Sequence, residues 1–133
     1  MKTTEINIRD PYILVHGSKY YLYGTRSATC WGPADGFDCY ASEDKENWDG
    51  PIEIFHRPES FFADQNYWAP ECIYYEEAFY LITTLGGSDR KKEFMYYVQN
   101  IRQDLLKCTV NGLHQRIGHV LMEQYTLNRE YHI

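Results

Sequence analysis

The feature that most constrains the fold is a strand–turn–strand pattern that occurs twice in the chain. Tyr12 to Thr25 holds two runs of β-branched and aromatic residues on either side of a Gly17-Ser18 turn. Glycine readily adopts the positive φ that a tight hairpin turn needs. Residues 73–84 repeat the pattern about sixty residues later. A hairpin that recurs at a fixed spacing is typical of the blades of a β-propeller, and a sandwich of short strands gives the same pattern.

Two more strands are predicted between the hairpins. Residues 36–42 form one strand, residues 42–48 a polar turn closed by Trp48, and residues 51–55 a short fourth strand. Beyond Lys92 the strand pattern ends, and residues 101–106 fit one or two helical turns. The sequence therefore predicts an all-β unit over residues 1–92 and an irregular tail over residues 93–133.

Charge and composition exclude several classes of protein. The net charge is −6 without a basic patch, so nucleic acid and membrane surfaces are not expected partners. The apolar runs are too short to span a membrane, and no apolar signal-peptide core follows Met1. The four cysteines lack C-x-x-C spacing, so neither a zinc site nor a redox pair is expected. We expect a cytoplasmic protein with reduced thiols, and no metal or other cofactor.

Asp10 is the first residue with a predicted chemical role. It precedes Pro11, which disfavours the helical conformation for Asp10, so we expect an extended residue at the mouth of the first strand. A carboxylate held rigidly there can act as a general base on water. An isolated Asp-Pro pair more commonly just opens a turn.

A second motif, Trp68-Ala69-Pro70-Glu71, precedes the second hairpin as Arg9-Asp10-Pro11 precedes the first. If both hairpins begin propeller blades, Asp10 and Glu71 would face one central cavity. Trp68 would then offer a flat apolar face to a sugar ring. The alternative is a packed tryptophan and a solvated glutamate. The aromatic content of 17% fits sugar binding, but strand propensity alone also explains it.

Taken in order and spacing, the motifs resemble those of the family 43 glycoside hydrolases. The resemblance covers residues 7–92 and rests on Arg9–Ile13, Lys19–Thr25, Ala41–Trp48, Trp68–Glu71 and Phe79–Ile82. It implies a five-bladed β-propeller, of which this chain would supply only about one and a half to two blades.

The family resemblance also implies a chemistry. Members hydrolyse arabinofuranosyl and xylosyl linkages with inversion, using an Asp base, a second Asp that tunes the pKa of the acid, and a Glu acid. Asp10 matches the base. Glu71 stands at the rim position where the family usually has Asp, and Trp68 and Phe37 are expected to line the sugar site. The second Asp, the Glu acid and the ligands of the calcium ion that the family often holds have no match here.

A frameshift offers an explanation for the tail. If the last base of each codon is read with the first two bases of the next, Met122-Glu123 yields a glycine codon, and its neighbours permit Asp-Gly-Thr-Ile-Tyr. The same shift across Gln103 to Lys107 permits Gly-Pro-Phe-Glu. Asp-Gly-Thr-Ile-Tyr suits the strand that the family has at its next blade, Gly-Pro-Phe-Glu suits the family's strand-ending turn, and both fall in the expected order. We therefore expect residues from about Glu93 onward to be a frameshifted translation.

Two functions follow from the sequence. The first is a glycosidase acting on arabinose- or xylose-containing glycans, here as an incomplete and inactive part of the enzyme. The alternative is a carbohydrate-binding or structural β-domain without catalysis. An incomplete propeller leaves blade faces and strand edges open, so self-association through these edges is also expected.

Overall fold

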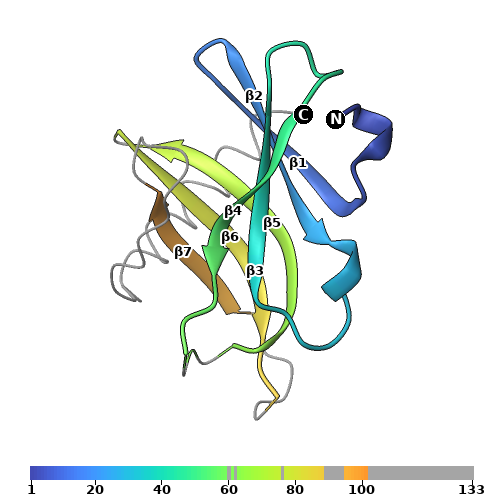
Figure 1. Ribbon diagram of the computed structural model, residues 1–133. Helices are drawn as coiled ribbons and strands as arrows, with labels where there is room; N and C mark the ends of the chain where they lie inside the picture. The colour runs from blue at the N-terminus through green and yellow to red at the C-terminus, as the bar shows by residue number, and fades with distance from the viewer. Residues whose placement is uncertain (60, 62, 76, 89–94, 102–133) are drawn as a thin grey trace, which may run out of the picture.

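Two antiparallel β-sheets make up the part of the protein that the computed structural model describes, namely residues 1–88 except 60, 62 and 76, and the backbone of residues 95–101 (Figure 1). The first sheet has the order β1 (Ile8–His16), β2 (Lys19–Arg26), β3 (Gly36–Ser42), β4 (Asp49–His56). The second has the order β5 (Gln65–Tyr75), β6 (Ala78–Gly86), β7 (Met95–Ile101). In both sheets, consecutive strands pair with each other, so each sheet is a meander. Short 3-10 helices cover Thr3–Glu5 and Ser27–Thr29.

The two predicted hairpins are confirmed. β1 and β2 are joined at Gly17, whose φ of 60° is the positive value expected of the turn. β5 and β6 form the second hairpin, and β3 has the bounds predicted for it.

β7 is a strand that the sequence did not predict. Its seven residues pair with β6 from Phe79↔Ile101 to Leu85↔Met95. The segment carries no alternation of apolar and polar residues, which is the signal that would have predicted a strand. Of the predicted helical turns over residues 101–106, only Ile101 is described, and it ends β7. The rest of the predicted tail lies outside the described residues.

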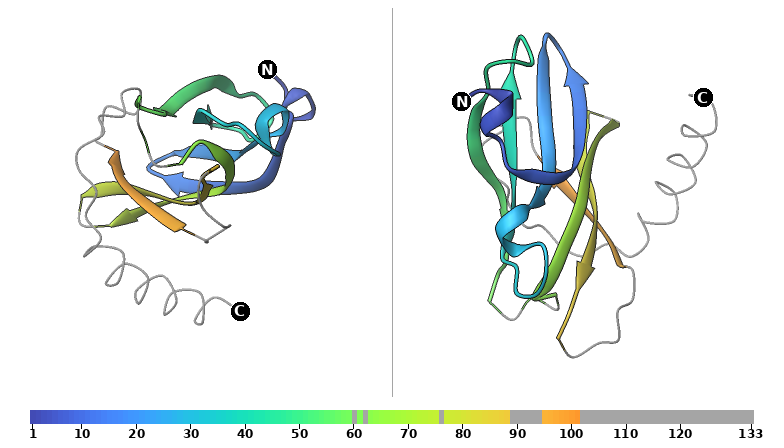
Figure 2. Two further views of the ribbon diagram at one scale, coloured as in Figure 1. Left: turned by 90° about the horizontal axis from the view of Figure 1, so that it is seen from below. Right: turned by 90° about the vertical axis from the view of Figure 1, so that its right-hand side faces the viewer.

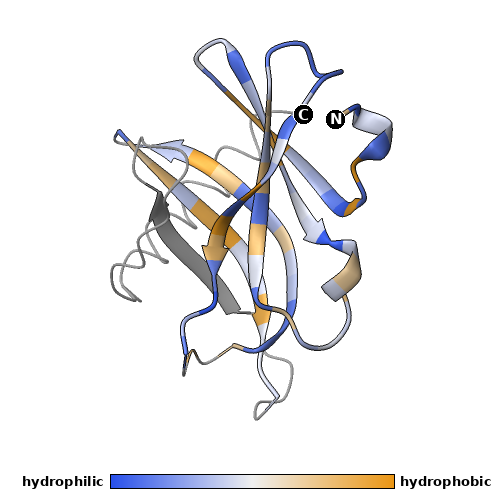
Figure 3. Cartoon of the chain, viewed as in Figure 1, coloured by the Kyte–Doolittle hydropathy of each residue, from blue (hydrophilic) through white to orange (hydrophobic). Residues whose placement is uncertain are grey.

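The sheets lie face to face as two layers (Figure 2), with β5 packed across β1, β2 and β3. Apolar side chains from both layers form one core, and the strongly hydrophobic segments in Figure 3 lie along the strands. Burying one such aromatic side chain stabilises the fold by roughly 1.5–3 kcal/mol. The core joins the two sheets, and its largest aromatic members are Tyr21, Tyr23, Phe37, Phe55, Tyr67 and Phe79.

A smaller cluster lies apart from this core, where Leu22, Tyr40 and Trp48 are covered by Ile6 and Ile8 near the N-terminus. The N-terminal segment is fixed there by paired backbone hydrogen bonds. The Trp48 amide donates to Met1 O at 2.8 Å, and the Met1 ammonium donates to Trp48 O at 2.8 Å.

Candidate functional site

Asp10 lies in a β-bulge near the start of β1. Arg9 pairs with Thr25 and Tyr12 with Tyr23, so Asp10 and Pro11 together stand opposite Gly24. This two-against-one arrangement bends the strand and re-aims its side chains. The sequence predicts an extended Asp10, but its φ is 50°. The prediction was wrong because the bulge needs a residue in the left-handed region, which aspartate tolerates better than most residues.

Gly24 makes the bulge possible. A Cβ at this position would lie 2.9 Å from the carbonyl oxygen of Arg9 and from Ile8 Cβ, closer than real Cβ contacts. The absence of a side chain on β2 therefore lets β1 approach at the bulge.

Thr25 fixes the Asp10 carboxylate and connects it to the second sheet. Its hydroxyl donates to Asp10 Oδ2 at 3.2 Å and accepts from the Ala69 amide at 2.8 Å. Thr25 is fully buried, whereas Asp10 is exposed. One carboxylate oxygen is thus held by a buried group while the residue remains open to water. This is the geometry that a general base needs.

β5 repeats the bulge of β1. Trp68 pairs with Thr84 and Glu71 with Ile82, so Ala69 and Pro70 stand opposite Thr83. Ala69 has a φ of 46°, close to that of Asp10. The structural counterpart of Asp10 in the second hairpin is therefore Ala69. The predicted equivalence of Asp10 and Glu71 was wrong, because register places the half-buried Glu71 level with Tyr12.

The predicted sugar platform, Trp68, is half-buried beside Ala69. Its indole nitrogen donates to Cys30 O at 2.5 Å. Its ring lies 5.2 Å from the Trp31 ring at an interplanar angle of 72°, an edge-on contact. Trp31 is 71% exposed, and sequence reasoning missed it because it belongs to no motif.

Phe37, also predicted to line the sugar site, lies in the core. Its side chain is 1% exposed and stacks on Tyr67 with ring centroids 5.3 Å apart. It contacts Phe55 as well, at 6.2 Å. The structure therefore places Phe37 in the core between the sheets, shielded from solvent.

Arg26, next to Thr25, forms ion pairs with three acidic side chains of the first sheet and its loops. Its Nε and Nη2 donate to the two oxygens of Asp38, at 2.8 and 2.5 Å, and Nη1 donates to Asp35 at 2.8 Å. Glu53 accepts from Nη2 at 2.9 Å, and this bond lowers the pKa of Glu53 below its ordinary value. Asp38, which pairs across from Gly24, is thus occupied by a cation, so it is poorly suited to serve as a protonated acid beside Asp10.

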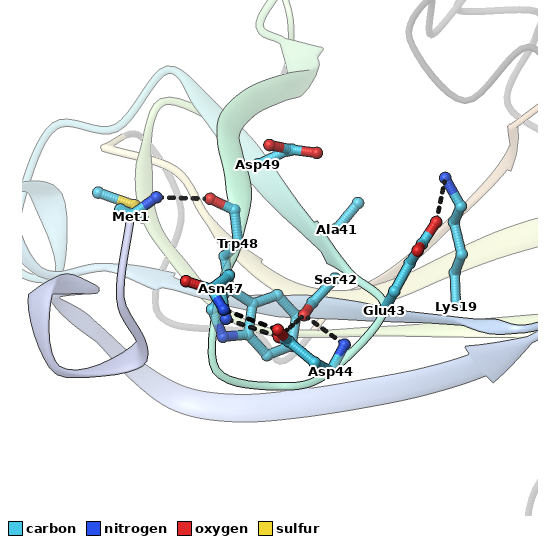
Figure 4. A pocket seen from close by; sticks show the side chains of 9 residues that line it. All are labelled: Met1, Lys19, Ala41, Ser42, Glu43, Asp44, Asn47, Trp48 and Asp49. Atoms are coloured by element: carbon cyan, nitrogen blue, oxygen red, sulfur yellow. Dashed lines mark hydrogen bonds and ion pairs between the residues drawn. The ribbon is translucent and has the colours of Figure 1, made fainter.

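A pocket of about 300 Å³ lies at the opposite end of the first sheet, around the β3–β4 turn (Figure 4). Tyr20 pairs with Ser42 at this end, whereas Arg9 pairs with Thr25 at the end that holds Asp10. The Asp44 carboxylate in this pocket accepts from the amides of Glu46 and Asn47. The Asp44 carboxylate therefore stabilises the β3–β4 turn.

Two absences concern the described residues alone. In that part of the chain no three His, Cys, Asp or Glu side chains gather to hold a metal ion, so the calcium implied by the resemblance has no ligand set there. No helix among the same residues is long and apolar enough to cross a membrane.

The sequence profile of glycosyl hydrolases family 43 matches residues 3–104, which include both hairpins and β7. The chain belongs to glycoside hydrolase family 43. The resemblance carried by the motifs is thereby confirmed. The matched region continues past Lys92. No curated protein matches the chain in sequence.

Solved structures of the family share the fold. An endo-arabinase from Bacteroides thetaiotaomicron VPI-5482 is 26% identical, with a TM-score of 0.65 over 89% of this chain and 40% of that one. A thermostable family-43 glycoside hydrolase is 25% identical, with a TM-score of 0.56 over 82% of this chain and 34% of that one. An exo-β-1,3-galactanase from Phanerochaete chrysosporium is 18% identical, with a TM-score of 0.70 over 89% of this chain and 29% of that one.

The chain therefore spans less than half the length of each of these enzymes. The family 43 neighbours are five-bladed propellers, and this chain corresponds to part of one. The predicted fold class, an incomplete five-bladed β-propeller, is confirmed. The sheet of β1–β4 is a four-stranded blade, and the sheet of β5–β7 belongs to the next one.

Proposed function

We propose that this chain is part of an inverting glycosidase of arabinose- or xylose-containing glycans, with Asp10 as its general base. The observation that carries the proposal is the Asp10 carboxylate, exposed at the bulge and held by the buried Thr25 hydroxyl. The likeness to an endo-arabinase supports an arabinosyl substrate. The galactanase among these structures shares the fold, but its sequence identity of 18% is too low to support a galactosyl substrate for this chain.

The described part of the chain contains the proposed base, Asp10, but no carboxyl group suited to be the general acid. Inversion needs a second, protonated carboxyl group about 6.5–9.5 Å from the base. Asp38 is taken by Arg26, and Ala69 stands where the second blade would repeat Asp10. We therefore propose that the chain is inactive by itself and that the acid and the pKa-tuning Asp belong to later blades.

We propose further that the tail predicted to start at about Glu93 is a frameshifted translation of those blades, with the shift lying close to residue 104, where the family match ends. The shifted words at Met122-Glu123 and at Gln103 to Lys107 support this proposal. The coding DNA tests it directly. A one-base shift between the codon for Lys92 and the end of the family match at residue 104 should open a long frame with further blade repeats. If the shifted frame closes early, the proposal is wrong.

Hydrolysis of aryl arabinofuranosides and aryl xylosides tests the catalytic role. The 133-residue chain should show no turnover, and a protein with the restored frame should hydrolyse one of the two substrates. Asp10→Asn in the restored protein should lower kcat by about 10²–10⁴-fold, because the water loses its base. Asp35→Asn, which alters a carboxylate held by Arg26, serves as the control and should leave kcat within about threefold. Unchanged turnover in Asp10→Asn would remove Asp10 from the mechanism.

The alternative is a carbohydrate-binding or structural β-domain without catalysis. The exposed Trp31 beside Trp68 favours sugar binding independently of any acid. This function predicts binding of oligosaccharides without hydrolysis, even after the frame has been restored.

A further inference from the structure

The loop between β2 and β3 is attached on both sides of one residue, to β5 of the second sheet and to β1 of the first. Before that residue, Cys30 O accepts from Trp68 Nε1 at 2.5 Å, and Cys30 Sγ accepts from Arg9 Nη1 at 3.4 Å. After it, Gly32 and Asn66 exchange two hydrogen bonds, Gly32 N to Asn66 Oδ1 at 3.0 Å and Asn66 N to Gly32 O at 2.9 Å. The residue between these two anchors is Trp31.

Trp31 is exposed although its neighbours in sequence are fixed. Its side chain is 71% exposed, while Cys30 is 5% exposed and Trp48 is 3% exposed. Leaving so large an apolar side chain in water forgoes the stabilisation that burial gives. Gly32 has a φ of 96°, so the loop uses a glycine-type conformation to pass Trp31. The backbone on both sides of Trp31 is thus anchored, while the indole stays exposed.

The two indoles form a corner. Trp31 meets Trp68 edge-on, at 5.2 Å and 72°, so the contact uses an edge of one ring and leaves aromatic face open. An aromatic face that is already fixed binds a ligand at low cost in conformational entropy. The C–H groups on the face of a sugar ring are the natural complement of such a surface.

The corner lies at the same end of the sheets as Asp10. Trp68 is followed by Ala69, whose amide donates to Thr25, and Thr25 donates to Asp10. Arg9, next to Asp10, reaches the loop at Cys30. A continuous series of contacts therefore connects the carboxylate to the exposed indole.

We propose that Trp31 is a stacking platform for a neutral glycan, binding a sugar unit beyond the one that Asp10 would serve. The proposal deepens the proposed function, on which the nature of the sugar rests. The binding itself depends only on the exposed indole and its anchored loop.

Calorimetric titration of the 133-residue chain with arabino- and xylo-oligosaccharides tests the platform, with tryptophan fluorescence recorded alongside. Trp31→Ala should weaken binding about tenfold, and Trp31→Phe should retain most of it because a ring remains. Binding should shift the fluorescence of the original chain, and Trp31→Phe should lose that shift. The control is Val15→Ala, which shortens another exposed apolar side chain (62% exposed) close to the β1–β2 turn, and it should bind normally.

Equal affinity in Trp31→Ala and the original chain would overturn the platform, as would the absence of oligosaccharide binding to the original chain. Loss of binding in both Trp31→Ala and Val15→Ala would also overturn it, since the effect would then be general. Failure of the catalytic proposal is recognised separately. In that case oligosaccharides bind through Trp31, while Asp10→Asn leaves hydrolysis by the restored protein unchanged.

Discussion

At the scale of single residues, Thr25 is a position of the candidate site whose side chain connects the two sheets. Its hydroxyl serves an amide of one blade and a carboxylate of the other, and no water reaches it. Neither Asp10 nor Ala69 could be assigned this partner from the sequence, because Thr25 lies at the far end of a hairpin. The hydroxyl therefore links the geometry of the base to the packing of the blades.

Thr25→Val should destabilise the protein by about 1–2 kcal/mol, since valine keeps the shape but leaves the partly buried Ala69 amide without its acceptor. Denaturant unfolding followed by circular dichroism measures the change. Thr25→Ser keeps the hydroxyl and serves as the control; it should recover part of the loss. Equal stability of the original chain and Thr25→Val would show that the bridge contributes nothing.

The buried thiols of Cys39 and Cys72, unlike the exposed Asp10 carboxylate, are chemically inert. Burial is the main cause that raises the pKa of Cys39 to about 12 and of Cys72 to about 11. Both stay protonated at neutral pH, and thiolates are the reactive form. These two cysteines are therefore core residues that belong to the same cluster as Tyr23.

At the scale of secondary-structure elements, the β3–β4 turn depends on the charge of Asp44. Its carboxylate accepts from the Asn47 amide at 2.7 Å, the Asn47 side chain at 2.7 Å and the Glu46 amide at 2.8 Å. These hydrogen bonds, led by the Asn47 amide, lower the pKa of Asp44 well below its ordinary value. A lowered pKa in the folded state means that the stabilisation is present above the ordinary carboxyl pKa, and is lost as the pH falls toward the folded value.

Asp44→Asn should therefore flatten the acid side of the stability profile. Between pH about 4 and pH about 2 the melting temperature of the original chain should fall more steeply than that of Asp44→Asn. Thermal melts across this range provide the measurement. Glu43→Gln is the matched control, because the 3.6 Å pair of Glu43 with Lys19 joins two exposed side chains and should matter little. Parallel profiles for the original chain and Asp44→Asn would contradict the assignment.

The elements also show what the sequence could predict and what it could not. Gly17 and the flanking strand formers predict the first hairpin, because turn chemistry and strand propensity are local. The paired bulges were not predictable from the sequence. A bulge sets two residues, such as Asp10 and Pro11, against one residue of the partner strand, so recognising it requires the register of that partner. Trp31 was missed for a related reason: its exposure depends on anchors in β5, which lies more than thirty residues away. Phe37 was misplaced because strand position alone does not tell which face becomes the core.

At the scale of the whole molecule, the chain must stabilise two blades without the remainder of a propeller. β1 shows the consequence. Tyr12 and Leu14 pack against the core, while the alternate residues Ile13 and Val15 are 43% and 62% exposed. In sheets, alternate positions point to opposite faces, so the outward face of β1 carries exposed apolar side chains. Such a face favours association, and so does the outer edge of β1, which pairs with no other strand among the described residues.

We therefore expect the 133-residue chain to self-associate. Size-exclusion chromatography with light scattering should show dimers or larger species whose share rises with protein concentration. Val15→Lys should lower that share, because a lysine on an edge strand opposes further pairing and its charge must stay in water. Ser18→Lys adds the same charge at the exposed β1–β2 turn, off the apolar face, and should change the distribution less. A monomeric original chain with one cooperative melt would contradict the expectation, and would mean that two blades form a self-sufficient unit.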